Sequence, residues 1–189
     1  MAKPDSQRGF AIIETLVAIS VLMIAIAGPL VVASRGLFGA AASKDQLIAS
    51  YLAQESLETA KNIRDINVYN INNGSTGIDW LTTGSSVTDL SLCTKASPCD
   101  ISVIDSATVS SCSSSGCPIY LESNGYGHVN GSGAVATPFT RYVYLNTPGG
   151  SGNCSVSGVE CTITAVIDWN EKTIPYEISM SSQLTDSAR

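Results

Sequence analysis

Apolar residues are unevenly distributed along this 189-residue chain. Residues 10–33 are almost entirely Ile, Leu, Val, Ala, Met and Phe, whereas residues 67–160 are dominated by Ser, Thr, Asn and Gly. An apolar run of about 24 residues forms roughly 36 Å of helix, enough to cross a hydrocarbon core about 30 Å thick. The pattern therefore predicts a membrane-spanning helix over residues 10–34.

The apolar run is too long for a cleaved secretory signal peptide, whose apolar region is about 7–15 residues. The residues on either side of the run set its orientation in the membrane. Lys3 and Arg8 precede it and the bulk of the chain follows it. Because basic residues stay on the cytoplasmic side, we expect a cytoplasmic N-terminus and an exported C-terminal part.

Residues 35–66 predict a second, amphipathic helical segment that continues from the first into the exported part. Its expected apolar face comprises Leu37, Ala41, Ile48, Leu52, Ile63 and Ile66. Its expected polar face comprises Gln46, Gln54, Glu58, Lys61 and Arg64. This 3.6-residue period predicts a helix packed on a domain.

The remainder, residues 67–189, predicts an exported globular head. Residues 67–138 are rich in turn residues and indicate short strands or loops. Three stretches rich in β-branched and aromatic residues predict strands at about 139–146, 161–169 and 174–180, the last two joined by a turn at 170–172. The expected fold class is α+β, a long N-terminal helix packed on a C-terminal antiparallel sheet.

Six cysteines fall into three close couples: Cys93 with Cys99, Cys112 with Cys117, and Cys154 with Cys161. None has the spacing of a zinc site, and an even count in an exported region indicates disulfides. Sequence alone leaves the connectivity open, and we favour pairing within each couple. Each such loop would stabilise the fold by roughly 2 kcal/mol.

Charge and candidate chemistry exclude several functions. The net charge of −6 argues against nucleic acid as a direct partner. The only histidine, His128, lies in a turn-like sequence without an acid or cysteine at a useful spacing, so we expect no nucleophile–base pair and no enzyme. We also expect no cofactor and no metal. A minority alternative is a calcium site drawn from Asp79, Asp89, Asp100 and Asp105.

Aromatic residues of the predicted strands have a simple explanation. Tyr142, Tyr144 and Trp169 are expected to be core or cross-strand residues, with surface recognition as the alternative.

Glu14 is the only charged residue between Arg8 and Arg35. A charged side chain near the centre of a membrane helix costs about 2.5–3.5 kcal/mol, so it persists where it has a partner or a use. The alternative is a tolerated side chain near the membrane surface.

The stretch RGFAIIETLVAISVLMIAIAGPL, residues 8–30, combines a short basic leader ending in Gly9, then Phe10, then an apolar run with Glu14 as its fifth residue. This arrangement resembles the class III signal of type IV prepilins and pseudopilins. The resemblance is specific over residues 8–33, and ETLVAI at 14–19 is more similar to minor pilins and pseudopilins than to major subunits. The expected fold is correspondingly pilin-like.

The resemblance implies a role for each of these residues. Residues 1–9 would be a leader removed by prepilin peptidase between Gly9 and Phe10, and Phe10 would become an N-methylated terminus. Glu14 would pair with that amine on a neighbouring subunit. The implied partners are other pilin or pseudopilin subunits, prepilin peptidase, an inner-membrane assembly platform and membrane lipid.

Two functions remain open. The favoured one is a structural, minor subunit of a type IV pilus or of a type II secretion or DNA-uptake pseudopilus. Such a subunit resides in the inner membrane before assembly and in a surface filament or periplasmic pseudopilus afterwards. The alternative is a single-pass membrane protein that displays an adhesin or binding domain and never polymerises.

Overall fold

A computed structural model of the chain describes residues 8–82, 88–102, 107–113, 116–128, 133–147, 154, 160–171 and 173–186. The chain divides into two compact units, Met1–Asp45 and Gln46–Arg189. We call the second unit the head. Within the described residues the elements are one long helix, a single short 3-10 turn and a seven-stranded sheet.

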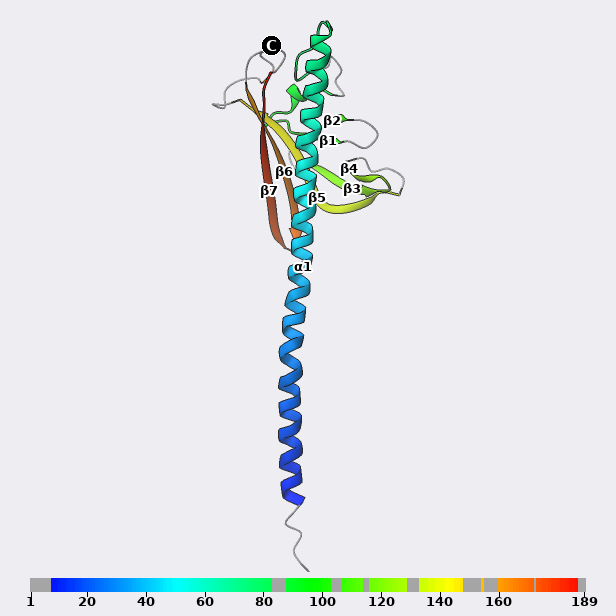
Figure 1. The fold of residues 1–189 in the computed structure, drawn as a ribbon. Helices are drawn as coiled ribbons and strands as arrows, with labels where there is room; N and C mark the ends of the chain where they lie inside the picture. The colour runs from blue at the N-terminus through cyan, green and yellow to red at the C-terminus, as the bar shows by residue number, and fades with distance from the viewer. Residues whose placement is uncertain are drawn as a thin grey trace, which may run out of the picture. The chain divides into compact units, whose positions relative to one another are not determined.

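The helix α1 spans Arg8–Asn72 and includes Pro29 (Figure 1). It therefore ends six residues later than the predicted boundary at residue 66. At its C-terminus the amide of Asn73 donates to the carbonyl of Tyr69, and Gly74 has a φ of +87°. A glycine in the left-handed region is the commonest way to end a helix, and it explains why the helix stops here.

The packed face of α1 in the head alternates alanines with larger aliphatic residues. Its buried apolar residues are Ala49, Leu52, Ala53, Leu57, Ala60, Ile63 and Val68. The predicted face was wrong at Ile66, which is 48% exposed, and at Leu37 and Ala41, which are exposed in the first unit. Alanine side chains let a helix approach a sheet closely, and a search for large apolar residues passes over them.

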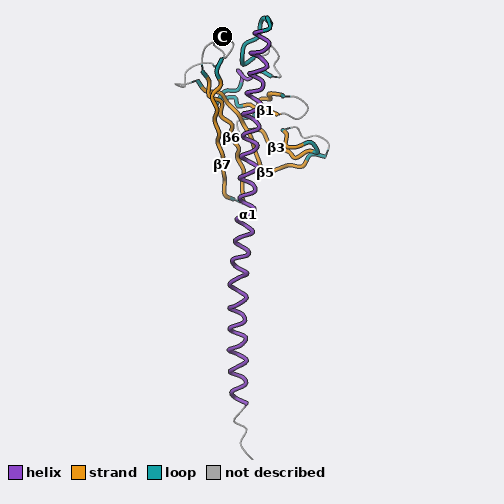
Figure 2. Tube along the Cα trace, viewed as in Figure 1, coloured by secondary structure: helices purple, strands orange, loops and turns teal. Residues whose placement is uncertain are grey.

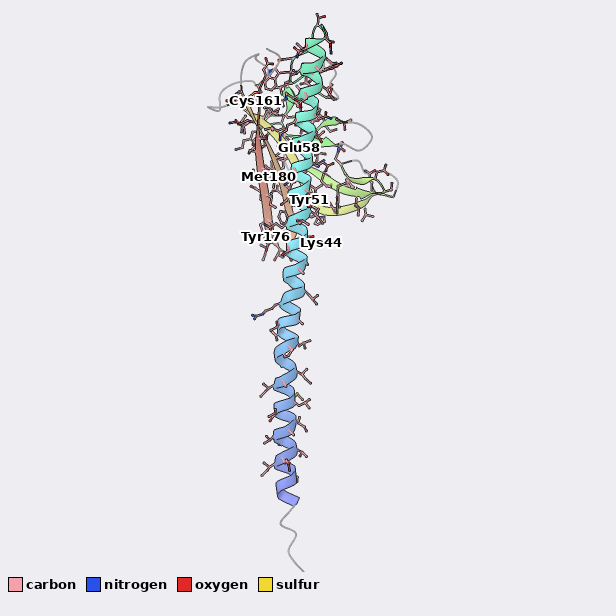
Figure 3. The ribbon with its side chains drawn as sticks, in the orientation of Figure 1. Lys44, Tyr51, Glu58, Cys161, Tyr176 and Met180 are labelled. Atoms are coloured by element: carbon pink, nitrogen blue, oxygen red, sulfur yellow. A yellow bond between two sulfur atoms is a disulfide. The ribbon has the colours of Figure 1, made fainter. Side chains whose placement is uncertain are left out.

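The opposite side of α1 in the head faces outward. Figure 3 labels Tyr51 and Glu58 on this part of α1. Tyr51 is 62% exposed, and Glu58 forms an exposed ion pair with Lys61. The expected polar face is exposed at Gln46, Gln54 and Glu58. It was wrong at Arg64, whose side chain is only 17% exposed and donates to the carbonyl of Thr185.

The sheet is antiparallel throughout. Figure 2 draws its strands in orange. Its strands are β1 (Cys99–Ser102), β2 (Thr108–Ser111), β3 (Cys117–Glu122), β4 (Gly125–Gly127), β5 (Val135–Asn146), β6 (Cys161–Glu171) and β7 (Ile174–Leu184). The predicted strands lie inside β5, β6 and β7, which are all longer than expected. The turn expected at 170–172 is shifted, because β6 continues to Glu171, and Lys172 lies outside the described residues.

Strand β5 is the centre of the sheet because three other strands pair with it. One edge of β5 pairs with β6 over Phe139–Asn146. The other edge is divided between β3, which pairs with the first half of β5, and β1, which meets it at Cys99 and Val143. The strands β2, β4 and β7 then extend β1, β3 and β6 respectively.

The core lies between α1 and the sheet. On β6 the alternate residues Cys161, Ile163, Ala165, Ile167 and Trp169 are all buried. They form one hydrophobic cluster with the buried face of α1 and with Phe139, Val143 and Leu145 of β5. On β5 only alternate residues are buried, which is the signature of a strand with one face on the core, whereas β6 also buries Thr164 and Val166 on its other face.

Three disulfides join Cys93 to Cys99, Cys112 to Cys117 and Cys154 to Cys161. Cys99, Cys117 and Cys161 are the first residues of β1, β3 and β6. Each strand that pairs with β5 therefore begins at a disulfide.

We expect Gly116→Ala to destabilise the head more than Gly74→Ala. Both glycines have a φ of +87°, so each substitution introduces backbone strain of about 1–2 kcal/mol. At Gly116 a Cβ would also lie 2.6 Å from Cγ2 of Thr140, which should add about 1–3 kcal/mol, whereas nothing lies within 4 Å at Gly74. Thermal unfolding of the two variants in detergent measures the difference, and equal losses would contradict the packing at Gly116.

Candidate functional site

The first candidate site is the N-terminal end of α1, where Gly9 and Phe10 lie in the first helical turn. Glu14 follows one turn later and is exposed, as are Ile12, Ile13 and Val17 around it. Among the described residues no ion pair to Glu14 is formed. A carboxylate on an apolar surface is costly away from water.

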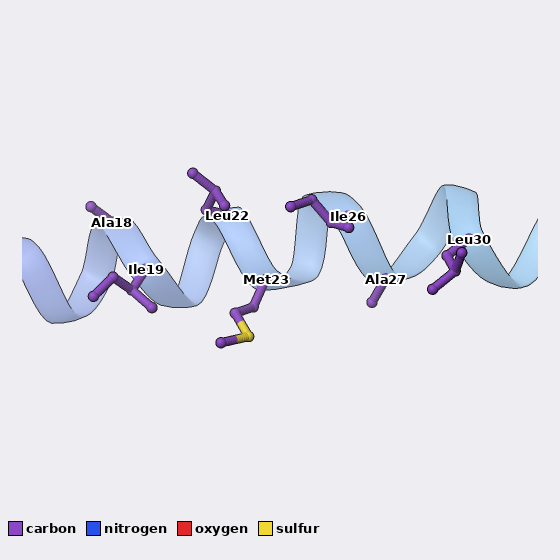
Figure 4. Close-up of a pocket in the computed structure, with 7 residues that line it drawn as sticks. All are labelled: Ala18, Ile19, Leu22, Met23, Ile26, Ala27 and Leu30. Atoms are coloured by element: carbon purple, nitrogen blue, oxygen red, sulfur yellow. The ribbon is translucent and has the colours of Figure 1, made fainter.

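The surface beyond Glu14 is apolar on all sides. The described side chains from residue 12 to residue 34 are all exposed in the structure. A shallow hollow on this stretch is lined only by apolar side chains, from Ala18 to Leu30 (Figure 4). By length and composition, α1 is the one helix among the described residues that could cross a membrane. A helix that is apolar all round needs lipid or other helices around it.

The second candidate site is a buried polar network in the head, centred on Arg141 of β5. The Arg141 side chain is completely buried. It forms a two-point ion pair with Asp100 of β1 and donates to the carbonyl of Ile101 at 2.9 Å. From α1, Glu55 approaches the guanidinium at 3.3 Å. Arg141 thus joins the helix to two strands of the sheet.

Burial and charge act against each other in this network. Burial alone would raise the pKa of Asp100, but the neighbouring His128 ring and the Arg141 guanidinium outweigh it and hold that pKa below its usual value. Burial raises the pKa of Glu55, although the Arg141 guanidinium opposes the shift. Asp100 is therefore the carboxylate that neutralises Arg141 most firmly, and Glu55 is a weaker partner at the edge.

His128 is not isolated, contrary to the expectation from sequence. Its Nδ1 lies 3.1 Å from Oδ2 of Asp100, although the ring N–H is not aligned for a hydrogen bond. Its Nε2 lies 3.0 Å from Oγ of Ser110 on β2. Asp100 lies 28 positions before His128 in the sequence, and Ser110 lies 18 positions before it. A search for partners at short spacing therefore could not find them.

The carboxylates considered for calcium have other roles. Asp79 accepts from the amide of Trp80, Asp89 accepts from Ser91 and caps the short 3-10 turn Leu90–Leu92, and Asp100 binds Arg141. Asp105 lies outside the described residues. No group of three metal-ligating side chains occurs in the part of the chain that the structure describes.

The aromatic residues divide between the two faces of the sheet. Trp169 is buried and stacks on Tyr176 with ring centroids 5.4 Å apart. Tyr142 and Tyr144 are half-buried and stack on each other at 6.5 Å. On the same side as Tyr142, the Asp168 and Glu177 positions face each other across β6 and β7. Burial and the Glu177 charge raise the pKa of Asp168.

The sequence did contain one usable signal for the buried network. Arg141 occupies the same alternating phase of β5 as Phe139, Val143 and Leu145, which are all buried. A cation in a core-facing phase requires an acidic partner inside the fold. The identity of that partner depends on the sheet topology, which the sequence does not specify.

We expect Arg141→Met to cost about 3–5 kcal/mol of stability at neutral pH, because Asp100 would be left buried without its cation. In the wild type the lowered pKa of Asp100 gives stability that is present at neutral pH and lost as the pH falls through that pKa. The cost of Arg141→Met should therefore shrink in acid, as Asp100 becomes protonated.

Lys61→Met is the matched control, because it breaks an exposed pair worth at most about 1 kcal/mol. Unfolding of both variants as a function of pH measures the two effects. A pH-independent cost for Arg141→Met would contradict the assignment of Asp100 as its principal partner.

Comparison with known proteins adds one finding. The prokaryotic N-terminal methylation motif matches residues 4–28. No curated protein and no solved structure matches the chain. The match covers Gly9, Phe10, Glu14 and most of the apolar run. The chain therefore carries the N-terminal methylation signal of type IV pilins and pseudopilins, at the start of the long helix of a pilin-like α+β fold.

Proposed function

We propose that this protein is a structural, minor subunit of a type IV pilus or of a type II secretion or DNA-uptake pseudopilus. The observation that carries the proposal is the methylation motif at residues 4–28, which overlaps the exposed apolar segment whose single charged residue is Glu14. Proteins with this signal are filament subunits and not enzymes. The similarity of residues 14–19 to minor subunits supports the minor role.

In this proposal prepilin peptidase removes residues 1–9, and Phe10 becomes the N-methylated terminus. The new terminus is an ammonium at the beginning of the apolar segment. The head is held outside the inner membrane by the helix over residues 10–34. Three disulfides in the head fit an oxidising, extracytoplasmic location.

Glu14 then supports assembly by pairing with the Phe10 ammonium of a neighbouring subunit. A carboxylate on an apolar surface is unfavourable alone, so packing that brings a cation to it is favoured at one axial position. The remaining apolar side chains pack on lipid before assembly and on neighbouring helices after it. The inner-membrane assembly platform is the partner that moves the subunit from one environment to the other.

The first test of this proposal is the mature N-terminus. We expect mass spectrometry of the protein from assembled filaments to find a chain that begins at Phe10 and carries a methyl group on its amine. The uncleaved chain in filaments would contradict the proposal, as would cleavage after the apolar run, near residue 33. Gly9 substitution should block processing while the protein still inserts into the membrane.

The second test is Glu14→Gln. If Glu14 pairs with an ammonium of the next subunit, the variant should insert, lose its leader and fold, yet enter filaments poorly. Breaking a buried pair costs on the order of 3–5 kcal/mol, which corresponds to a loss of incorporation of roughly a hundredfold or more.

Glu58→Gln is the control, because Glu58 is an exposed carboxylate on the head. Immunoblotting of sheared filaments and of membranes separates assembly from insertion. Normal assembly of Glu14→Gln would favour the alternative of a membrane-anchored adhesin that does not polymerise.

A further inference from the structure

At one end of the buried network three side chains lie in a line. Their geometry fits a chemical role as well as a structural one. Ser110, His128 and Asp100 come from β2, the residue after β4, and β1. Oγ of Ser110 lies 3.0 Å from Nε2 of His128, and Nδ1 of the same ring lies 3.1 Å from Oδ2 of Asp100. The imidazole therefore has a hydroxyl at one nitrogen and a carboxylate at the other.

The sheet explains why these groups meet. Asp100 and Ser110 are direct cross-strand partners in the β1–β2 pair, so their side chains lie on the same face. The residue that follows β4 brings the His128 ring between them. The hydroxyl and the carboxylate are thus placed by regular strand pairing, and not by a loop.

Asp100 is held in the ionised form in which it can orient an imidazole. Its side chain is fully buried, and Arg141 binds both of its oxygens. A carboxylate anchored in this way cannot turn away from the ring. The poor alignment of the Nδ1–H group does not exclude the role, because such hydrogen bonds are often long or misaligned until a reactant is bound.

Access to the hydroxyl is partial. Ser110 is half-buried, and the His128 side chain is 17% exposed. Ser110 also borders a surface hollow together with Val109, Ser111 and Asp89. The hollow gives a small reagent a route to β2 from solvent, and its lining includes neither His128 nor Asp100.

We propose that Ser110 is an activated nucleophile, with His128 as its general base and Asp100 as the residue that positions His128. The substrate class is an activated acyl ester. Oγ of Ser110 bonds to the acyl carbon as its proton passes to Nε2 of His128, and the ester's alcohol leaves and takes that proton. The product is an acyl group covalently attached to Ser110.

This assignment uses the minimum geometry of a serine nucleophile: a base within hydrogen-bond reach and a group that orients the base. It concerns reactivity at one hydroxyl of the head. It is independent of the assembly function, because neither Glu14 nor the apolar helix takes part. Either proposal can fail while the other stands.

The experiment is labelling of the full chain, in detergent, with a fluorophosphonate. Oγ of Ser110 forms a bond to phosphorus, fluoride leaves, and the proton is released through His128. We expect a single adduct, located on Ser110 by peptide mapping. Ser110→Ala should abolish it. His128→Gln should slow its formation by about 10²–10⁴-fold, the usual contribution of a general base.

Ser111→Ala is the matched control, because Ser111 is the adjacent, exposed hydroxyl on the same strand. Its labelling rate should equal that of the wild type. Intact disulfides and an unchanged unfolding temperature establish that Ser110→Ala and His128→Gln are folded. The proposal is overturned if the wild type gains no adduct on Ser110, or if His128→Gln reacts as fast as the wild type.

Discussion

A guanidinium buried in the head needs acceptors on every side, and this requirement fixes the arrangement of the surrounding elements. Arg141 is completely buried, and its partners come from β1 and from α1. Removal of a charge from water costs several kcal/mol, which only well-placed acceptors recover. The position of the helix over the sheet and the approach of β1 to β5 are therefore linked through one side chain.

Helix α1 meets two different demands along its length. The segment over residues 10–34 is apolar on every side and carries one carboxylate, Glu14, so lipid or other molecules must surround it. The part of α1 in the head buries one narrow face, rich in alanine at Ala49, Ala53 and Ala60. Small residues allow the helix backbone to approach the sheet closely. The apolar segment over residues 10–34 instead presents larger side chains, which suit packing against lipid acyl chains.

Much of the architecture could be predicted from the sequence because it depends on local patterns. The apolar run, the three long strands and the antiparallel sheet follow from composition and from residue periodicity. The disulfides within each couple agree with the short spacing of the cysteines. The phase of Arg141 in its strand indicated a buried cation, but its acidic partner and the Asp100–His128–Ser110 cluster could not be predicted, since short strands in a turn-rich region bring these residues together. Ile66 was misplaced because a helical period alone does not say which of two neighbouring stripes is packed.

The disulfides at the starts of β1, β3 and β6 bear on how the head would respond to tension. The two cysteines of each disulfide are five to seven positions apart. Each disulfide therefore shortens the length to which the chain can be stretched by only about 20 Å. None ties one of these strands to β5. Under load along the chain, resistance would come from shearing of the hydrogen-bonded ladders that flank β5, and the covalent links would mainly keep the strand ends in place for re-pairing. Reduction of the disulfides would then affect recovery after stretching more than the force needed to stretch.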